Sequence, residues 1–488
     1  MHKLNNKTNL KVNIMSSSLN KSSQNISKRI ERQFQITSDF EKRTILKDKI
    51  TIFYLNTIVD KDQIQKYIIE PLQQTWETVN EDNPSIQQIK TIVNSASLKE
   101  TQSVEEIQDA LVKGNTFLLI EGETSGLLIP TTKWIERGLE ETLGERAIRG
   151  PAVGFTETLT TNINIIRRII QTPQLIIDTK PCGTHLKTDI SIIYMKHLVN
   201  RSILQEVQHR ISKIDVDYIL ASRIVEDAIE GKPKTFVNLV MTKERVDTTT
   251  SALLEGKVIV FVDGSPYSII APSLFVDFFQ SADDFHLKTG RLINRSIRYF
   301  GFITSILIPG IYVGLEKFHS DTYSKKIQKD LFNHGELLPT FWEIALLLIL
   351  FRILIDIGTR APKGTVIIIT LLATIVIGEM SVSAKLIHPA SLVVTGLSVY
   401  LSTLVIYRGQ SGIGSLRFLY FFTCYYFGLP SIMLVSTIVI LYLVQLKSVG
   451  VPYLSPLIPF RCDEFQDIFV RGNLRKLQRK SHEFPNVE

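Results

Sequence analysis

The chain has 488 residues, which is too long for one compact core and predicts several domains. Its formal net charge of +7 comes from scattered Lys and Arg beside nearly as many Asp and Glu, and no motif in it indicates a nucleic acid partner. The cysteines lie far apart and form no Cys-x-x-Cys pair, so the sequence predicts neither a disulfide framework nor a zinc site.

The first part of the chain is predicted to be a polar tail followed by a small α/β subdomain. Residues 1–29 are rich in Asn, Ser and Lys, lack Asp and Glu, and contain no apolar run of the kind found in signal peptides. We therefore expect a disordered tail. Apolar periodicity then predicts an N-terminal α/β subdomain over residues 30–145. Its expected elements are a strand at 50–55, helices at 62–72 and 104–112, and a hairpin at 117–129.

The turn inside that hairpin, at residues 121–126, resembles the tight turn that presents a nucleophile in some hydrolases. Its central residue is Thr124, however, and a strand follows it where such an enzyme has a helix. A plain hairpin is therefore favoured. The sequence contains no phosphate-binding glycine motif and no histidine spacing typical of a metal site, so we expect no cofactor, no metal and no enzymatic activity.

A second α/β subdomain is predicted over residues 146–290. An apolar stripe at 155–170 predicts a helix, with Arg167 and Arg168 in its last turn and Pro173 just beyond it. Further expected elements are strands at 190–194 and 236–241, a helix at 199–211, and a hairpin at 258–270. Because strands alternate with helices, we predict an α/β class with two small subdomains and mixed sheets, followed by an all-α multispanning membrane domain.

The membrane domain is predicted over residues 291–458, where the long apolar runs lie. Five apolar segments give four to six crossings; they cover residues 299–315, 341–357, 366–384, 388–406 and 418–445. The second segment carries Glu343, Arg352 and Asp356, so it is either an interfacial helix or a span that faces a polar interior. The last segment either forms one tilted span or doubles back at Pro430.

Basic residues flank these apolar runs. Those before the first run are Lys288, Arg291, Arg295 and Arg298, and five more follow the last run at 471–480, within a basic tail at 459–488. Basic residues gather on the cytoplasmic side of membrane proteins. Both the α/β region and the tail are therefore predicted to be cytoplasmic, which requires an even number of crossings.

Two stripes of small and hydroxyl residues follow one face of each of two neighbouring predicted spans. The candidate pore-lining stripe contains Thr370, Thr374, Gly378, Ser381 and Lys385. The second stripe contains Ser391, Thr395, Ser398 and Ser402. Such residues either let neighbouring helices pack closely and hydrogen-bond, or line a water-filled path in an oligomer. In the second case Lys385 would act on ions at the pore mouth.

The run from residue 149 to residue 168 resembles the signature of the spore germination GerA family. The signature residues are Arg149, Gly150, Pro151, Gly154, Phe155, Glu157, Asn162, Arg167 and Arg168. Further landmarks occur in family order at residues 38–39, 254–258, 263–266, 276–281 and 449–456. The resemblance therefore covers nearly everything after about residue 30.

The resemblance implies the A subunit of a nutrient germinant receptor in the inner membrane of an endospore, with the α/β region on the cytoplasmic side. It implies B and C receptor subunits and membrane lipid as partners, and a homo-oligomer for which a pentamer is the expected ring. Such a ring would release monovalent cations as a ligand-gated channel, without covalent chemistry. The alternative is the paralogous stage V sporulation A-operon membrane protein, acting as an ion channel outside a nutrient receptor.

Two other function classes make different predictions. A transporter would show two related membrane halves with broken helices, and no repeat of that kind is visible in the sequence. A scaffold anchored by its helices would not need aligned polar stripes. The two stripes therefore argue against a simple anchor.

Overall fold

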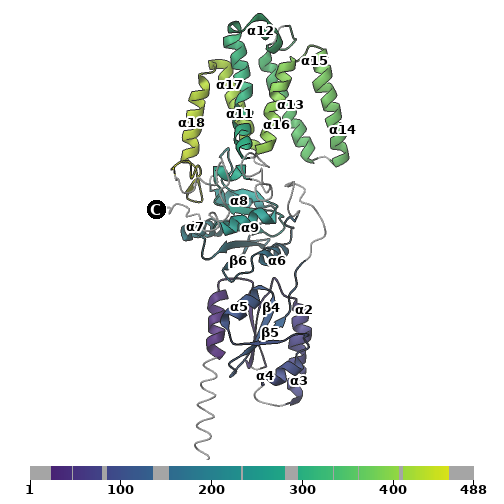
Figure 1. Ribbon diagram of the computed structural model, residues 1–488, viewed down its shortest axis with the longest axis vertical. Helices are drawn as coiled ribbons and strands as arrows, with labels where there is room; N and C mark the ends of the chain where they lie inside the picture. Colours follow the sequence, from purple (N-terminus) through teal and green to yellow (C-terminus); the bar gives the residue numbers. More distant parts are fainter. Residues whose placement is uncertain are drawn as a thin grey trace, which may run out of the picture.

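The computed structural model describes residues 23–46, 48–79, 85–135, 153–231, 235–280, 295–332, 335–360, 362–405 and 410–460. It arranges the chain in three parts along one long axis (Figure 1). A first α/β layer lies at one end, a second α/β layer lies in the middle, and a group of long helices lies at the other end.

The first layer is built on a five-stranded sheet with the order β1-β2-β4-β5-β3. Its strands are β1 (Phe40–Ile45), β2 (Ile50–Leu55), β3 (Lys99–Thr101), β4 (Asn115–Ile120) and β5 (Gly126–Pro130). Alternation along β2 sends Ile50 and Ile52 to one core and Phe53 and Leu55 to the other. The first core is covered by η1 (Ile64–Ile69), which continues the short helix α2 (Lys61–Gln63), and by α3 (Glu70–Val79) and α4 (Ile86–Ile92). The second core is covered by α5 (Val104–Val112) and a helix over 23–34.

The helix over residues 23–34 corrects the predicted tail, which extended to residue 29. Ile26, Ile30 and Phe34 follow one another at helical spacing, and all three are buried in the core beside α5. Polar residues such as Asn, Ser and Lys predominate around these three apolar residues, so the composition of the segment does not indicate a helix. Residues 1–22 of the predicted tail lie outside the described residues.

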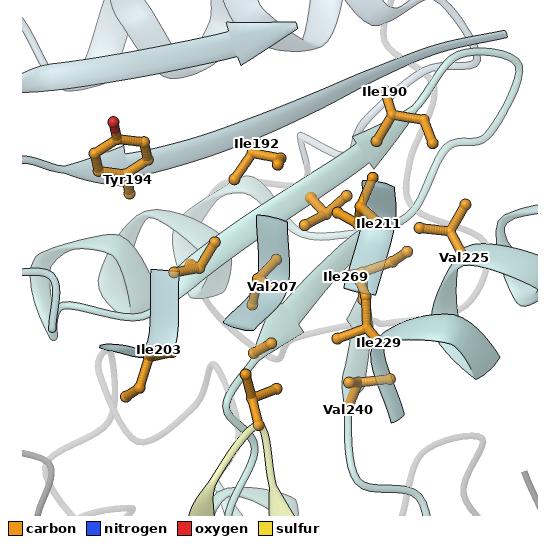
Figure 2. Packing of buried hydrophobic residues seen from close by; sticks show 14 of the residues in the cluster. Ile190, Ile192, Tyr194, Ile203, Val207, Ile211, Val225, Ile229, Val240 and Ile269 are labelled. Carbon is orange, nitrogen blue, oxygen red and sulfur yellow. The ribbon is translucent and has the colours of Figure 1, made fainter. Parts of the chain in front are cut away.

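The second layer contains a five-stranded sheet with the order β6-β7-β9-β10-β8. Its strands are β6 (Leu175–Cys182), β7 (Thr188–Met195), β8 (Met241–Lys243), β9 (Val258–Val262) and β10 (Ser268–Ala271). One face packs against α7 (Arg201–Ser212) and α8 (Ser222–Glu230), where Ile192 meets Val207 and Val225 in one cluster (Figure 2). The other face packs against α6 (Leu159–Ile169) and α9 (Val246–Leu254).

The two sheets share one topology, because each places its strands in the order first, second, fourth, fifth, third. The helix over 23–34 precedes β1 as α6 precedes β6. A local sequence pattern repeats as well, with Ala-Leu-Val-Lys-Gly at 110–114 and Ala-Leu-Leu-Glu-Gly at 252–256. Both glycines adopt positive φ, 86° at Gly114 and 88° at Gly256, at the same turn from helix into strand. The layers are therefore structural repeats.

The prediction of mixed sheets is wrong for the described strands, because every strand pairing in both sheets is antiparallel. Tight hairpins connect β4 to β5, β6 to β7 and β9 to β10, and a hairpin sets its strands antiparallel. The helices after β2 and β7 lead to the edge strands β3 and β8, and α5 and α9 then lead to β4 and β9, which do not neighbour the edge strands that precede them. The predicted strand at 236–241 is correct only at Met241, where β8 begins.

The helical part contains α11 (Arg295–His319), α12 (Lys325–Leu331), α13 (Thr340–Arg360), α14 (Lys363–Ala373), η5 (Thr374–Met380), α15 (Ser381–Ser383), α16 (Pro389–Val405), α17 (Gln410–Phe427) and α18 (Ser431–Gln445). Helix α11 runs unbroken through Pro309. The apolar run at 418–445 is divided between two helices, as the alternative with a turn at Pro430 predicts, because Gly428, at a φ of 72°, and Pro430 turn the chain between α17 and α18.

Two helices within the described residues are long and apolar enough to cross a membrane, at 295–322 and 364–383. The apolar helices at 389–403 and 431–445 are shorter. Helix α13 carries Glu343, Arg352, Asp356 and Arg360. The count of four to six crossings therefore stays a prediction.

The chain returns to the second layer after α18. The short strands β11 (Lys447–Ser448) and β12 (Val451–Pro452) form a hairpin, and Val449 and Val451 enter the core beside α7 and α8. Ser448 Oγ donates to Leu239 O and accepts from Ser273 N at 2.9 Å. These residues were expected to belong to a membrane domain ending at 458, but they complete the α/β layer instead.

Replacing Ser448 by Ala should lower the free energy of unfolding by about 1–3 kcal/mol, because it leaves a buried carbonyl and a buried N–H without their partner. Thermal unfolding of the detergent-solubilised full chain measures the change. Ser202→Ala, at an exposed position on α7, is the control and should be nearly neutral. Equal stability of Ser448→Ala and wild type would contradict a docked return segment.

Candidate functional site

A buried ion pair joins the two α/β layers, and with its neighbours we call it the interlayer joint (Thr37, Ser38, Asp39, Asn164 and Arg167). Arg167 lies on α6 of the second layer, and Asp39 directly precedes β1 of the first. Arg167 Nη2 lies 2.8 Å from Asp39 Oδ1, and Arg167 Nε lies 3.0 Å from Asp39 Oδ2. The side chains are 0% and 3% exposed. Two parallel hydrogen bonds of this kind fix orientation as well as distance.

Hydrogen bonds along the edge strand β6 extend the interlayer joint. Ser38 N donates to Ile177 O at 2.7 Å, and Thr179 N donates to Ser38 Oγ at 2.9 Å. Ile177 N donates to Thr37 Oγ1 at 3.1 Å. A free sheet edge presents unpaired backbone groups, and the first layer satisfies these groups here. The first layer is thus attached to the second through a sheet edge and an ion pair.

Two asparagines on α6 complete the arrangement. Asn164 Nδ2 donates to Thr57 O at 2.7 Å and to Lys133 O at 3.0 Å, and both of these carbonyls belong to the first layer. Asn162 Nδ2 instead donates to Thr156 O at 2.6 Å, and Thr156 N donates back to Asn162 Oδ1 at 2.8 Å. Asn164 therefore binds the first layer across the joint, whereas Asn162 binds the main chain of Thr156, just before α6.

The electrostatics of the joint keep the Asp39 carboxyl ionised. Burial alone raises the pKa of Asp39, but the Arg167 guanidinium and the hydroxyls of Thr37 and Thr57 outweigh burial. The pKa of Asp39 therefore lies below its ordinary value of 3.8. At neutral pH the pair is fully charged, which makes the loss of either partner costly.

A second cluster lies where the second layer meets the helices, and we call it the membrane-facing joint (Lys257, Asp277, Ser448 and Tyr453). Lys257 Nζ lies 2.7 Å from Asp277 Oδ2 and 3.6 Å from Glu255 Oε2, and the Lys257 and Asp277 side chains are both nearly buried. Burial lowers the pKa of Lys257, but Asp277 and Glu255 outweigh burial and hold the pKa above its ordinary value. This pair ties the start of β9 to η2 (Phe275–Phe279).

The membrane-facing joint contacts both α11, the first helix of the helical part, and the segment that follows α18. Phe275 N donates to Tyr453 O at 2.9 Å, which links η2 to the segment after α18. The ring of Phe279 stacks on Tyr299 of α11 at 4.1 Å between ring centres, and Arg298 Nη1 donates to Phe279 O at 2.8 Å. A displacement of η2 would therefore act on α11 and on the return segment together.

The remaining signature residues occupy different surroundings. Residues 149–151 lie outside the described residues. Gly154 and Phe155 are buried, Phe155 in the core beneath α6 and α9. The side chains of Glu157 and Arg168 are exposed. Among the signature residues that the structure describes, Arg167 is the one that carries a charge into the interior.

The candidate pore-lining stripe lies along a groove of about 390 Å³ between α13, α14 with η5, and α16. Thr370, Thr374 and Gly378 line this groove, whereas Ser381 and Lys385 lie beyond it and Lys385 is exposed. The hydroxyls of Thr370 and Thr374 each donate to a carbonyl of their own helix at 2.8 Å. The structure thus brings three of the five predicted residues together along the groove, and it does not bring Ser381 and Lys385 to it.

The second stripe is buried between helices instead. Its four members are each at most 5% exposed; they are Ser391, Thr395, Ser398 and Ser402. Ser398 Oγ donates to Ser305 O of α11 at 2.7 Å. Of the two interpretations, close packing of neighbouring helices describes this stripe.

Several of these partners were not apparent in the sequence. Asp39, Arg167, Lys257 and Asp277 all stand in family landmarks, but no sequence pattern pairs them. Arg417 on α17 was not singled out, although its 8% exposure makes it a buried charge among apolar helices. Each of the five is a charged residue that interrupts an apolar stretch or lies close to one, which is the signal that could have found them.

Within the described ranges, no three His, Cys, Asp or Glu side chains lie close enough to hold a metal ion. Both joints consist of ion pairs, hydrogen bonds and aromatic contacts. Such an arrangement holds parts of a protein in a fixed relation and can pass a displacement from one part to the next.

Replacing Arg167 by Met should lower the free energy of unfolding by about 3–5 kcal/mol, because it leaves the Asp39 carboxylate buried without its partner. The double variant Arg167→Met/Asp39→Asn should lose less than the sum of the two single changes. Thermal or denaturant unfolding of the full chain in detergent measures this cycle. Arg168→Met is the matched control on the same helix and should stay within about 0.5 kcal/mol of wild type. Additive losses would contradict the pairing.

The same cycle has an acid readout. Because the pKa of Asp39 is lower in the folded chain than in the unfolded chain, the pair stabilises fully above the unfolded pKa, and this contribution is lost as the pH falls through the folded pKa. Below about pH 4, wild type should therefore lose stability more steeply than Asp39→Asn. Parallel curves for the two proteins would show that the carboxyl is not ionised in the joint.

Comparisons with known proteins agree with the resemblance in the sequence. A family model described as Bacillus/Clostridium GerA spore germination protein matches residues 18–483. Spore germination protein KA of Bacillus subtilis (strain 168) is 29% identical over 426 residues, which cover 86% of this chain and 78% of that protein. Stage V sporulation protein AF of the same strain is 26% identical over 437 residues, which cover 88% and 87%.

Among solved structures, the crystal structure of the N-terminal domain of the A subunit of the Bacillus megaterium spore germinant receptor GerK3 is similar to this chain. It is 28% identical, with a TM-score of 0.40, and the match covers 51% of this chain and 93% of that one. The family match spans both α/β layers and the helical part. The chain therefore belongs to the GerA family of spore germination proteins.

Proposed function

We propose that the chain is the A subunit of a nutrient germinant receptor that triggers spore germination. The observation that carries this proposal is the family match over residues 18–483, together with relatives that are themselves named as spore germination proteins. In this role the chain needs no covalent step, because its task is to pass a conformational change from receptor partners to the membrane.

The two joints supply a physical route for such a change. The interlayer joint holds the first layer to the second through Arg167 and Asp39. The membrane-facing joint connects the second layer to α11 and to the segment after α18 through η2. A partner that binds either α/β layer would act on the helices through these contacts.

We place the protein in the spore inner membrane with both α/β layers on the cytoplasmic side. Arg295 and Arg298 begin α11 at the end of the helical part that faces the layers, which supports a cytoplasmic position for them (Figure 1). The expected partners are B and C receptor subunits, membrane lipid and further copies of this chain. We expect those copies to form a ring, with five as the number to test.

The ring would act as a ligand-gated channel that releases monovalent cations. Helix α14 with η5 and α15 is a candidate lining of the channel. Residues 364–383 include no buried residue, so the surface of this segment is open to neighbouring copies. The hydroxyls of Thr370 and Thr374 donate to their own helix, so their oxygen lone pairs are left to contact a cation. Lys385 at the end of the stripe would act on ions electrostatically.

The alternative function is that of the stage V sporulation paralogue, an ion channel outside a nutrient receptor. The 26% identity to stage V sporulation protein AF, over 88% of this chain, is the specific observation that keeps it in play. Both functions use the same fold. They differ in whether the response depends on one class of nutrient.

Spores that lack this chain should lose the germination response to one class of nutrient while keeping their response to others, because a receptor subunit serves only its own receptor. The loss of optical density after exposure to separate nutrients measures the response, and restoring the gene should restore it. A slowing that is equal for every nutrient would favour the paralogue's role.

In liposomes, oligomers of the purified chain should conduct monovalent cations. Thr374→Leu should reduce this cation flux about tenfold, because the loss of one coordinating oxygen in each copy raises the free-energy barrier to ion passage by roughly 1.4 kcal/mol. A cation-sensitive dye inside the liposomes measures the flux. Thr437→Leu is the matched control, since Thr437 on α18 donates to its own helix in the same way. An absence of flux under every gating condition would end the channel proposal, and unaltered flux in Thr374→Leu would move the path to another helix.

A further inference from the structure

Arg417 is a charged side chain inside the helical part, where burial of a charge is costly. It lies on α17 and is 8% exposed. Its Nε donates to Ser305 O of α11 at 3.0 Å, and its Nη2 donates to Ser398 O of α16 at 3.2 Å. Within the described residues, no carboxylate forms an ion pair with it. Its charge is therefore stabilised by two main-chain carbonyls that belong to two different helices.

The first of these carbonyls is available because of Pro309. In an α-helix the carbonyl of residue 305 accepts from the N–H of residue 309, and proline has no N–H. Helix α11 continues on both sides of this position, so the gap is local. Ser398 Oγ and Arg417 Nε both donate to the same freed oxygen, at 2.7 and 3.0 Å. Two neighbouring helices thus replace one hydrogen bond that α11 lacks.

Close backbone contact surrounds this bond. A Cβ atom added at Gly310 of α11 would lie only 2.9 Å from Tyr420 O of α17, so only glycine allows this approach. The helix pairs α11–α16 and α11–α17 are in extensive contact, and the polar stripe of α16 is buried between them. By contrast, the apolar segment formed by α14, η5 and α15, at residues 364–383, has no buried residue.

We propose that Arg417 is a positioning residue that replaces the hydrogen bond removed by Pro309 and so holds α11, α16 and α17 as one unit. This unit keeps its internal arrangement when the protein changes state. A serine alone could satisfy the freed oxygen, as Ser398 does. The planar guanidinium does more, because it reaches carbonyls of two helices at once from a third.

The first test is a stability cycle that needs no channel activity. Arg417→Met should lower the apparent Tm of the full chain in detergent by about 3–6 °C, because two buried carbonyls lose a donor. In a Pro309→Ala background the N–H of residue 309 satisfies Ser305 O, so the same change should lower the Tm by less than half as much. Arg352→Met, at an exposed arginine on α13, is the matched control and should leave the Tm nearly unchanged.

Equal losses of Tm in both backgrounds would overturn the proposal, because Arg417 would then act independently of Pro309. Arg417→Lys provides a second variant in case Arg417→Met does not fold. Lysine keeps the charge but cannot bridge two carbonyls with a planar fork, so it should recover only part of the Tm. Full recovery by lysine would show that charge alone is required and would also overturn the proposal.

The second test asks whether α11 and α17 move apart. A Cβ at Gly314 would lie 3.7 Å from Cys424 Cβ, within the range of about 3.5–4.5 Å that a disulfide needs. Gly314→Cys, with Cys182 and Cys462 changed to Ser, should therefore cross-link α11 to α17 on oxidation. Cation flux in liposomes should be equal before and after oxidation, and loss of flux that reductant restores would overturn the proposal. This arm relies on the proposed channel function; if no sample conducts, that function fails and the stability cycle decides the inference.

Discussion

The pairing of Arg167 with Asp39 sets the relation between the two α/β layers. Each layer has its own apolar clusters on both faces of its sheet, so little apolar surface is shared between them. Within the described residues, what joins them is a buried ion pair together with hydrogen bonds along β6 and from Asn164. A buried charge whose partner lies in the other layer makes separation costly, whereas each layer alone would keep its core. The layers are therefore two bodies held in one orientation by polar contacts.

The same physical solution recurs at each boundary of the molecule. Lys257 and Asp277 form a nearly buried pair where the second layer meets the helices, and Arg417 binds carbonyls of two helices within the helical part. Apolar packing builds each part, and buried cations fix how the parts are oriented. Such contacts have strict geometry and a high cost when broken, so they hold the parts in discrete relative arrangements.

Local periodicity was enough to predict β2, the hairpins β4–β5 and β9–β10, and helix α5, because each shows a clear apolar alternation or stripe. Strand β1 has only one buried residue, Ile45, and β6 contains Pro181, so neither shows the pattern of a strand. The run at 418–445 is apolar throughout, so the sequence could not decide between one tilted span and the turn that the structure shows beside Pro430. The joints could not be predicted, since Arg167 and Asp39 are 128 residues apart and Arg417 acts on a carbonyl that only a folded α11 reveals.

The return of the chain to the second layer has a consequence for how the protein is made. The layer's core includes Val449 and Val451, which a ribosome adds only after the helices α11 to α18. Until then, the apolar surface that these residues cover stays open to water, because the side chains that bury it do not yet exist. Completion of the second layer therefore requires that α18 has been synthesised and that the chain after it has returned to this layer. A chain that failed to return would leave that surface uncovered, where quality-control proteases and chaperones can recognise it.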